Sequence, residues 1–136
     1  MTKAKVLIAD DDEDILRAMC LRLKAHGYEV VWAVDAVQAV MRARQEKPDV
    51  AVLDVHMPAG DGLAVMDKFL KCEDTIDIPV VIVTADTQQS TRDRALSAGV
   101  RHYLTKPFET KHLIACVERA LATKAGGSMT ASDSLG

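Results

Sequence analysis

The stretch LIADDDED, residues 7–14, joins a short apolar segment to five consecutive acidic residues. The apolar part belongs to the run KVLIA, residues 5–9, which is continuous rather than alternating in hydrophobicity. Such a run is typical of a strand covered on both faces, as in a parallel sheet between two layers of helices. We therefore expect a buried first strand that ends in a cluster of carboxylates.

Further short apolar runs recur along the chain and predict more strands. They are YEVVWA (28–33), VAVLD (50–54), IPVVIVT (78–84) and HYLT (102–105). Trp32, in the second of the five runs, and Cys20 are expected in or near the core.

The segments between the strands predict helices. We expect helices over 14–25, 36–46, 88–98 and 110–123, and one that starts after Asp61 and carries Leu63, Met66 and Leu70. Asp12 and Asp14 are residues typical of a helix start, and Asp35 with Gln38 resembles a capping box. The helix over 88–98 is polar with little apolar stripe, so we expect it to be the most weakly packed and the best candidate for a movable element.

Strands that alternate with helices predict an α/β fold, (βα)5, with right-handed crossovers. These are too few units for a closed eightfold barrel. We predict a doubly wound, flavodoxin-like, five-stranded parallel sheet of order 2-1-3-4-5 with helices on both faces. In such sheets ligands bind beyond the carboxyl ends of the strands, where the first and third strands lie side by side.

Composition indicates one folded domain: the chain has 136 residues, of which 49% are hydrophobic and 27% charged. A formal net charge of −3 provides no cationic field, so we expect no direct contact with nucleic acid or a membrane. Cys20, Cys72 and Cys116 form no CxxC pair and are expected to be reduced thiols. The N-terminus lacks a secretory signal, and we expect a cytoplasmic protein.

Polar residues follow the predicted strands where they end: Asp10 and Asp11, then Asp54, Thr84 and Lys106. Three carboxylates this close repel one another unless a cation neutralises them, and oxygen ligands of this kind suit Mg²⁺. A metal with open positions, a lysine and a hydroxyl are the parts that phosphoryl transfer requires. An aspartate can itself be the nucleophile and form an acyl phosphate.

Four segments resemble, in order, the motifs of the receiver domain of two-component response regulators, the CheY-like superfamily. They are LIADD (7–11), VLDVHMPAGDGL (52–63), VIVTA (81–85) and LTKPF (104–108). The resemblance covers residues 4 to about 123, so we expect a receiver domain over 1–123 and a flexible tail or the start of a linker over 124–136.

The resemblance implies that Asp54 accepts a phosphoryl group from the phosphohistidine of a sensor histidine kinase or phosphotransfer protein. It implies a Mg²⁺ site, in which Mn²⁺ can substitute, with Asp11 and Asp54 as carboxylate ligands. His56 would bind through its backbone carbonyl, and Asp10 mainly through water. The chain would be no enzyme beyond its own phosphorylation and slow autodephosphorylation.

The resemblance also implies which residues change position when Asp54 is phosphorylated. Thr84 and Lys106 would each contact the phosphoryl group, Lys106–Pro107 would be a cis peptide, and Tyr103 would swing inward as Thr84 moves. The signal would leave through the surface formed by helix 88–98, strand 102–105 and helix 110–123, toward an output domain, a partner protein or a second copy in a homodimer. The side chains of His56 and Asp86 would lie near the water path that hydrolyses the acyl phosphate.

Alternatives remain open at this point. The acidic pocket also suits a metal-dependent phosphatase or phosphotransferase, although no long loop is available to enclose a small substrate. A pseudo-receiver that no longer accepts phosphate is disfavoured by the intact set of site residues. His56 as a side-chain metal ligand lacks a partner at metal spacing, which favours a rim position. The chain is either a complete regulator or part of a longer one, and the linker-like tail favours the second.

Overall fold

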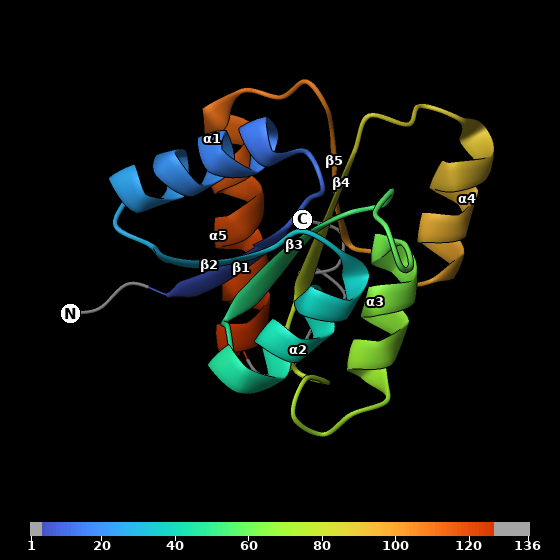
Figure 1. Ribbon diagram of the computed structural model, residues 1–136, viewed down its shortest axis with the longest axis horizontal. Coiled ribbons are helices and arrows are strands. Elements are labelled where there is room, and N and C mark those ends of the chain that lie inside the picture. Colours follow the sequence, from blue (N-terminus) through green and yellow to red (C-terminus); the bar gives the residue numbers. More distant parts are fainter. Residues whose placement is uncertain (1–3, 127–136) are drawn as a thin grey trace.

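The computed structural model describes residues 4–126 and contains one parallel sheet (Figure 1). Its strands are β1 (Lys5–Ala9), β2 (Glu29–Ala33), β3 (Val50–Asp54), β4 (Val80–Thr84) and β5 (His102–Thr105). They lie in the order β2-β1-β3-β4-β5, so the predicted topology is confirmed. All the strand pairs are parallel.

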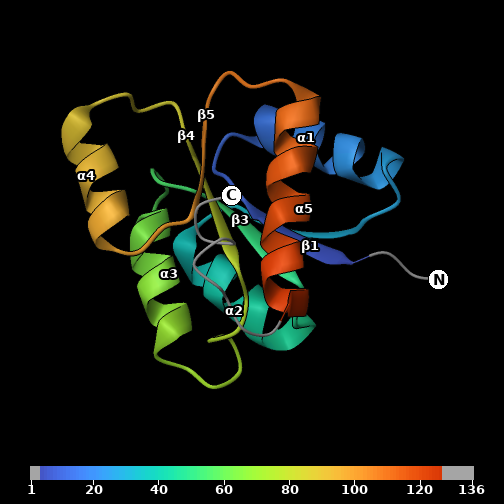
Figure 2. The same ribbon diagram turned by 180° about the vertical axis from the view of Figure 1, so that it is seen from behind.

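Helices connect consecutive strands and cover both faces of the sheet. They are α1 (Glu13–Ala25), α2 (Ala36–Glu46), α3 (Gly62–Leu70), α4 (Gln89–Ser97) and α5 (Thr110–Gly126). Helices α1 and α5 lie on one face, as the view from behind shows (Figure 2), and α2, α3 and α4 lie on the other. The two faces give two separate apolar clusters.

The strands alternate their side chains between these two clusters. In β1, Val6 and Ile8 pack with α1 and α5, whereas Leu7 and Ala9 pack with α2 and α3. The same alternation continues in β3 and β4. Both faces are buried, which explains why the runs show no polar alternation.

Aspartates begin the first three helices. Asp12 accepts hydrogen bonds from the amides of Asp14 and Ile15, and Asp61 accepts one from the amide of Ala64 at 2.8 Å. Asp35 accepts from the amide of Gln38 at 2.7 Å, and the Gln38 side chain accepts from the amide of Val34 at 3.1 Å. The Gln38 bond goes one residue before the cap, so the capping box is only partly realised.

Several predicted positions differ from the structure. Trp32 is 49% exposed, so its expected place in the core is wrong; β2 is an edge strand, and among the described strands β1 is its one neighbour in the sheet. Leu70, which lies on the predicted apolar side of the helix after Asp61, is also exposed. Strands β2 and β4 begin later than predicted, and α5 continues to Gly126 rather than ending at 123. The remaining tail, 127–136, lies outside the described residues.

Helix α4 is the least anchored helix, as the sequence indicated. Its buried residues are Thr91 and Ala95, and its N-cap residue Gln88 makes no side-chain capping bond. Polar contacts hold it instead, as described below. Figure 1 shows α4 at the margin of the fold, beyond α3.

None of the helices between residues 4 and 126 combines the length and the apolar content needed to cross a lipid bilayer.

Candidate functional site

Three carboxylates meet where β1 and β3 end. These two strands are neighbours in the sheet, so Asp10, just after β1, comes to lie beside Asp54, the last residue of β3. One carboxylate oxygen from each of Asp10, Asp11 and Asp54 lies within 4.8 Å of the others. Asp10 is fully buried and Asp54 nearly so, whereas Asp11 is exposed. The cluster therefore has a buried floor and an open side.

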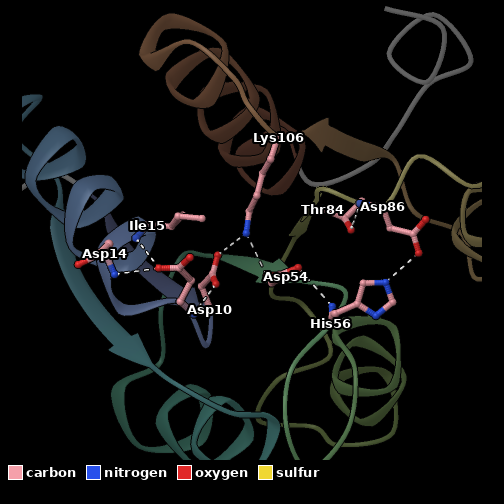
Figure 3. A network of polar contacts seen from close by, with 9 residues as sticks. Asp10, Asp14, Ile15, Asp54, His56, Thr84, Asp86 and Lys106 are labelled. Atoms are coloured by element: carbon pink, nitrogen blue, oxygen red, sulfur yellow. Dashed lines mark hydrogen bonds and ion pairs between the residues drawn. The ribbon is translucent and has the colours of Figure 1, made fainter.

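Lys106 approaches this cluster from the segment after β5 (Figure 3). Its Nζ donates to Asp10 Oδ2 at 2.7 Å and to Asp54 Oδ2 at 3.0 Å. Its backbone N–H donates to the carbonyl of Thr84 at 2.8 Å, and the peptide bond to Pro107 is cis. One ammonium group thus bridges two carboxylates that belong to different strands.

The charges of the cluster are not balanced by Lys106 alone. Burial raises the pKa of Asp54, the hydrogen bond from Lys106 lowers it, and the charge of Asp10 raises it; the net shift is upward. Burial would lower the pKa of Lys106, but its hydrogen bonds to Asp10 and Asp54 outweigh this and raise it. With three carboxylates and one ammonium, the donor set of hard oxygens suits a divalent cation such as Mg²⁺.

The loop after β3 holds Asp54 through its backbone. The amide of His56 donates to Asp54 Oδ1 at 3.2 Å. Ala59 and Gly60 have positive φ values of 65° and 132°, a backbone conformation that glycine adopts readily. These residues reverse the direction of the chain, so that α3 begins next to the backbone of Asp54 and Val55.

Gly62 is a site residue that sequence reasoning missed. Its amide donates to the carbonyl of Val55 at 2.9 Å, and a Cβ placed on it would lie 2.3 Å from the carbonyl oxygen of Asp54. Only glycine allows α3 to approach the Asp54 backbone this closely. The signal available in the sequence was a glycine directly after the helix cap Asp61, a position where a better helix former is expected.

His56 and Asp86 form a bridge across the rim of the site (Figure 3). His56 Nε2 lies 2.8 Å from Asp86 Oδ2, and the His56 side chain is 63% exposed. Thr91 Oγ1, on α4, donates to the same Asp86 oxygen at 2.7 Å. The bonds from Thr91, from the amide of Gln88 and from His56 hold the pKa of Asp86 at about 2. The His56 side chain therefore occupies a rim position and contacts a carboxylate.

Thr84 is buried at the end of β4, and its Oγ1 accepts a hydrogen bond from the amide of Asp86 at 3.0 Å. Asp86 thus joins Thr84, His56 and Thr91 of α4 in one polar network. The family resemblance implied a role for Thr84 but did not indicate that Thr91 completes this connection.

Two arginines fasten α4 to its neighbours. The Arg92 guanidinium lies 5.4 Å from the centre of the Tyr103 ring, which packs half-buried against the α2–α3 side of the core. Arg94 Nη2 lies 2.8 Å from Asp61 Oδ2, on the cap of α3. Tyr103 is thus placed next to α4, apart from the carboxylate cluster.

Solved structures place the fold in a known class. The CheY-like response regulator receiver domain protein from Methanospirillum hungatei is 25% identical and superposes with a TM-score of 0.83, covering 92% of this chain and 98% of that one. The chemotaxis response regulator CheY4 of Vibrio cholerae is 29% identical with a TM-score of 0.81, covering 88% and 100%. The fold and the acidic strand ends define a CheY-like, flavodoxin-like domain.

Sequence comparison gives the family. The family model for the response regulator receiver domain matches residues 6–118. The transcriptional regulatory protein PrrA of Mycobacterium tuberculosis is 38% identical over 97% of this chain, which spans 55% of PrrA. Protein PilH of Pseudomonas aeruginosa is 35% identical, with 88% of this chain and 98% of PilH covered. The chain belongs to the response regulator receiver domain family.

Membership makes this a signalling domain of two-component systems, a family that generally binds Mg²⁺ and receives its signal from a histidine kinase. The chain spans about half the length of PrrA but nearly all of PilH. Relatives of both lengths therefore share this domain.

Proposed function

We propose that this domain accepts a phosphoryl group on Asp54 from the phosphohistidine of a sensor histidine kinase or phosphotransfer protein. An Asp54 carboxylate oxygen attacks phosphorus, the bond between phosphorus and the histidine nitrogen breaks, and its electron pair remains on the imidazole. The product is an acyl phosphate on Asp54. Attack of water on phosphorus later releases phosphate and restores the carboxylate.

Mg²⁺, or Mn²⁺ in its place, would be held by the carboxylates of Asp11 and Asp54 and the backbone carbonyl of His56, with Asp10 acting mainly through water. When bound, it supplies positive charge that offsets the charge on the transferring phosphoryl oxygens. Lys106 is positioned to pair with one phosphoryl oxygen, since it already contacts Asp54 Oδ2. The Thr84 hydroxyl, at the end of β4, donates to another.

The proposed switch runs from Thr84 to α4. The Thr84 hydroxyl now accepts from the amide of Asp86, so its movement toward a phosphoryl group pulls on the segment that holds Thr91. Tyr103 turns inward as Thr84 leaves, and its contact with Arg92 breaks or moves. Few apolar contacts hold α4. A difference of a few kcal/mol in free energy between its two positions, caused by phosphorylation, is therefore enough to shift it.

The proposed recipient of the signal is an output domain or partner protein that contacts the surface of α4, β5 and α5, or a second copy in a homodimer. We propose that the receiver domain ends with α5 and that the Gly- and Ser-rich sequence after it serves as a tail or linker. We further propose a cytoplasmic location, in keeping with free Cys20, Cys72 and Cys116.

The observation that carries the proposal is the carboxylate cluster itself. Asp54 is nearly buried, its pKa is raised, and Asp10 and Asp11 lie beside it, with Lys106 as the single counter-charge among residues 4–126. Such an arrangement is costly unless a cation and an incoming anion use it.

The test is treatment of the chain with acetyl phosphate and Mg²⁺, followed by intact mass and peptide mapping. We expect one added phosphoryl group on Asp54, its loss in Asp54→Ala and in metal-free buffer, and its retention in Asp74→Ala, which removes an exposed loop carboxylate. An unchanged adduct mass in Asp54→Ala would overturn the assignment. Multiple turnover of small phosphate esters would favour the phosphatase alternative instead.

A further inference from the structure

Three polar side-chain contacts join α4 to its neighbours within residues 4–126. They are Thr91 with Asp86, Arg92 with Tyr103 and Arg94 with Asp61. In the proposed switch, Asp86 and Tyr103 change position together with α4. Asp61 is different, because it lies at the start of α3 and outside the segments that the switch moves. Of these three contacts, that of Arg94 is therefore the one that depends on where α4 lies relative to the site.

Asp61 is held to the backbone of the site. Its Oδ1 accepts a hydrogen bond from the amide of Ala64 at 2.8 Å and so caps α3. The next residue, Gly62, lies so close to the Asp54 carbonyl that no Cβ fits there, and its amide donates to the carbonyl of Val55 at 2.9 Å. Asp61 therefore keeps its position next to β3 when α4 moves.

The ion pair between Asp61 and Arg94 spans an open groove. The groove has a volume of about 880 Å³, lies between α3 and α4, and is lined by both residues of the pair. Small residues line much of the rest, among them Gly60, Ala64, Ser90 and Ser97. Because no large side chains fill the groove, packing does not fix the distance between the two helices along it. Helix α4 has room to shift there, and the ion pair is what bridges the gap.

Both members of the pair are charged at neutral pH. Burial raises the pKa of Asp61, but the hydrogen bond from Arg94 and those from backbone amides of α3 outweigh it, and the net shift is downward. Arg94 Nη2 lies 2.8 Å from Asp61 Oδ2, and the two side chains are 55% and 26% exposed. A pair exposed to this extent contributes modestly, so its loss changes an equilibrium by a factor of a few.

We propose that the Asp61–Arg94 ion pair is a latch that holds α4 in its present position and thereby opposes phosphorylation of Asp54. This inference rests on the proposed function of Asp54 as phosphoacceptor. In the present position, Thr84 Oγ1 accepts from the amide of Asp86. When Thr84 turns toward a phosphoryl group, α4 shifts while Asp61 stays with β3, so the ion pair is stretched. A contact made in one of two positions favours that position and weakens binding that requires the other.

The test is the affinity of the full chain for beryllofluoride, a mimic of the phosphoryl group, titrated by fluorine NMR with saturating Mg²⁺. We expect Arg94→Ala to bind it about threefold more tightly, the factor that a partly exposed ion pair supplies. Asp61→Asn keeps the α3 cap and loses the charge, so it should give the same gain, and the double variant should gain no more than either single one. Lys71→Ala, which removes the exposed pair with Asp67, should leave the affinity unchanged.

Several outcomes would overturn the latch. An affinity of Arg94→Ala that equals or falls below that of the unaltered chain would do so, as would independent gains that multiply in the double variant. Arg94→Lys keeps the charge and should retain most of the original affinity; a full gain in this variant would show that the ion pair is not responsible. Failure of the unaltered chain to form any adduct would instead overturn the role of Asp54 as phosphoacceptor, and the latch with it.

Hydrogen exchange gives a second reading of the same chain without beryllofluoride. We expect Arg94→Ala to speed the exchange of backbone amides in α4 and to leave β1 and β3 unchanged, because the latch acts on α4 and not on the sheet. Unchanged exchange in α4, or faster exchange throughout the domain, would contradict the proposal.

Discussion

Replacing Lys106 by methionine removes the one cation that the structure places within the carboxylate cluster. Its Nζ bridges Asp10 and Asp54, and the side chains of these three residues are 12%, 0% and 9% exposed. Methionine retains most of the apolar length, so the change isolates the charge. The buried carboxylates of Asp10 and Asp54 then have no counter-charge from the part of the chain that the structure describes, so any bound metal would be their remaining counter-charge.

The expected loss in the free energy of unfolding is about 3 kcal/mol at neutral pH without metal, since breaking a buried pair leaves an uncompensated charge. A matched control is Lys71→Met, whose pair with Asp67 is exposed at 74% and 60%. Exposed pairs of this kind contribute about 0.5 kcal/mol or less. The difference between the two losses in free energy of unfolding therefore reports the effect of burying the ion pair, because both variants replace a lysine by methionine.

Urea unfolding followed by circular dichroism, in EDTA, measures both losses. Without Lys106 the pKa of Asp54 rises further, so protonation at lower pH should shrink the deficit. Adding Asp54→Asn to Lys106→Met should likewise recover part of it. A loss under about 1 kcal/mol, or one that neither acid nor Asp54→Asn reduces, would refute the reasoning.

Three further perturbations follow from the geometry. Gly62→Ala places a methyl group against the Asp54 carbonyl and should cost about 2 kcal/mol in urea unfolding; a neutral effect would contradict the close approach. Burial lowers the pKa of His102, so the unfolded chain binds its proton more readily and stability should fall as pH drops below about 6.5; His102→Gln should flatten that profile, and an unchanged slope would exclude His102 as its cause. Asp61→Ala should cost about 1 kcal/mol by removing the α3 cap, and Asp61→Asn less, because asparagine retains the cap but loses the ion pair with Arg94; equal losses would show that the ion pair dominates.

The fold was predictable because hydrophobic pattern and helix caps agree along most of the chain. Continuous apolar strands predicted burial on both faces, and strand ends located Asp10, Asp54 and Lys106. Exposure at the edge of the sheet was not predictable in the same way. The predicted strand order already placed β2 at the edge of the sheet, but Trp32 was assigned to the core from its apolar side chain alone, and so its exposure was missed.

Contacts between residues of different loops could not be predicted from sequence patterns either. The His56–Asp86 bridge joins residues 30 positions apart, and Thr91 and Arg94 meet their partners only after α4 has docked. Gly62 contributes to the site because it has no side chain, which allows α3 to approach the backbone of Asp54 closely. Whether Asp54, Thr84, Lys106 and Tyr103 have their assigned roles in phosphorylation stays a prediction until the mass measurement is made.

The Lys106 bridge spans the chain: it closes a separation of 96 residues to Asp10 and 52 to Asp54. Its formation requires β1, β3 and β5 to have found their places, which is the slow, non-local part of folding a parallel sheet. A ribosome-bound chain that lacks β5 would have Asp54 without its lysine. If Asp54 accepts phosphate as proposed, the domain would therefore become competent to do so only after β5 and the segment that carries Lys106 have been synthesised and have docked.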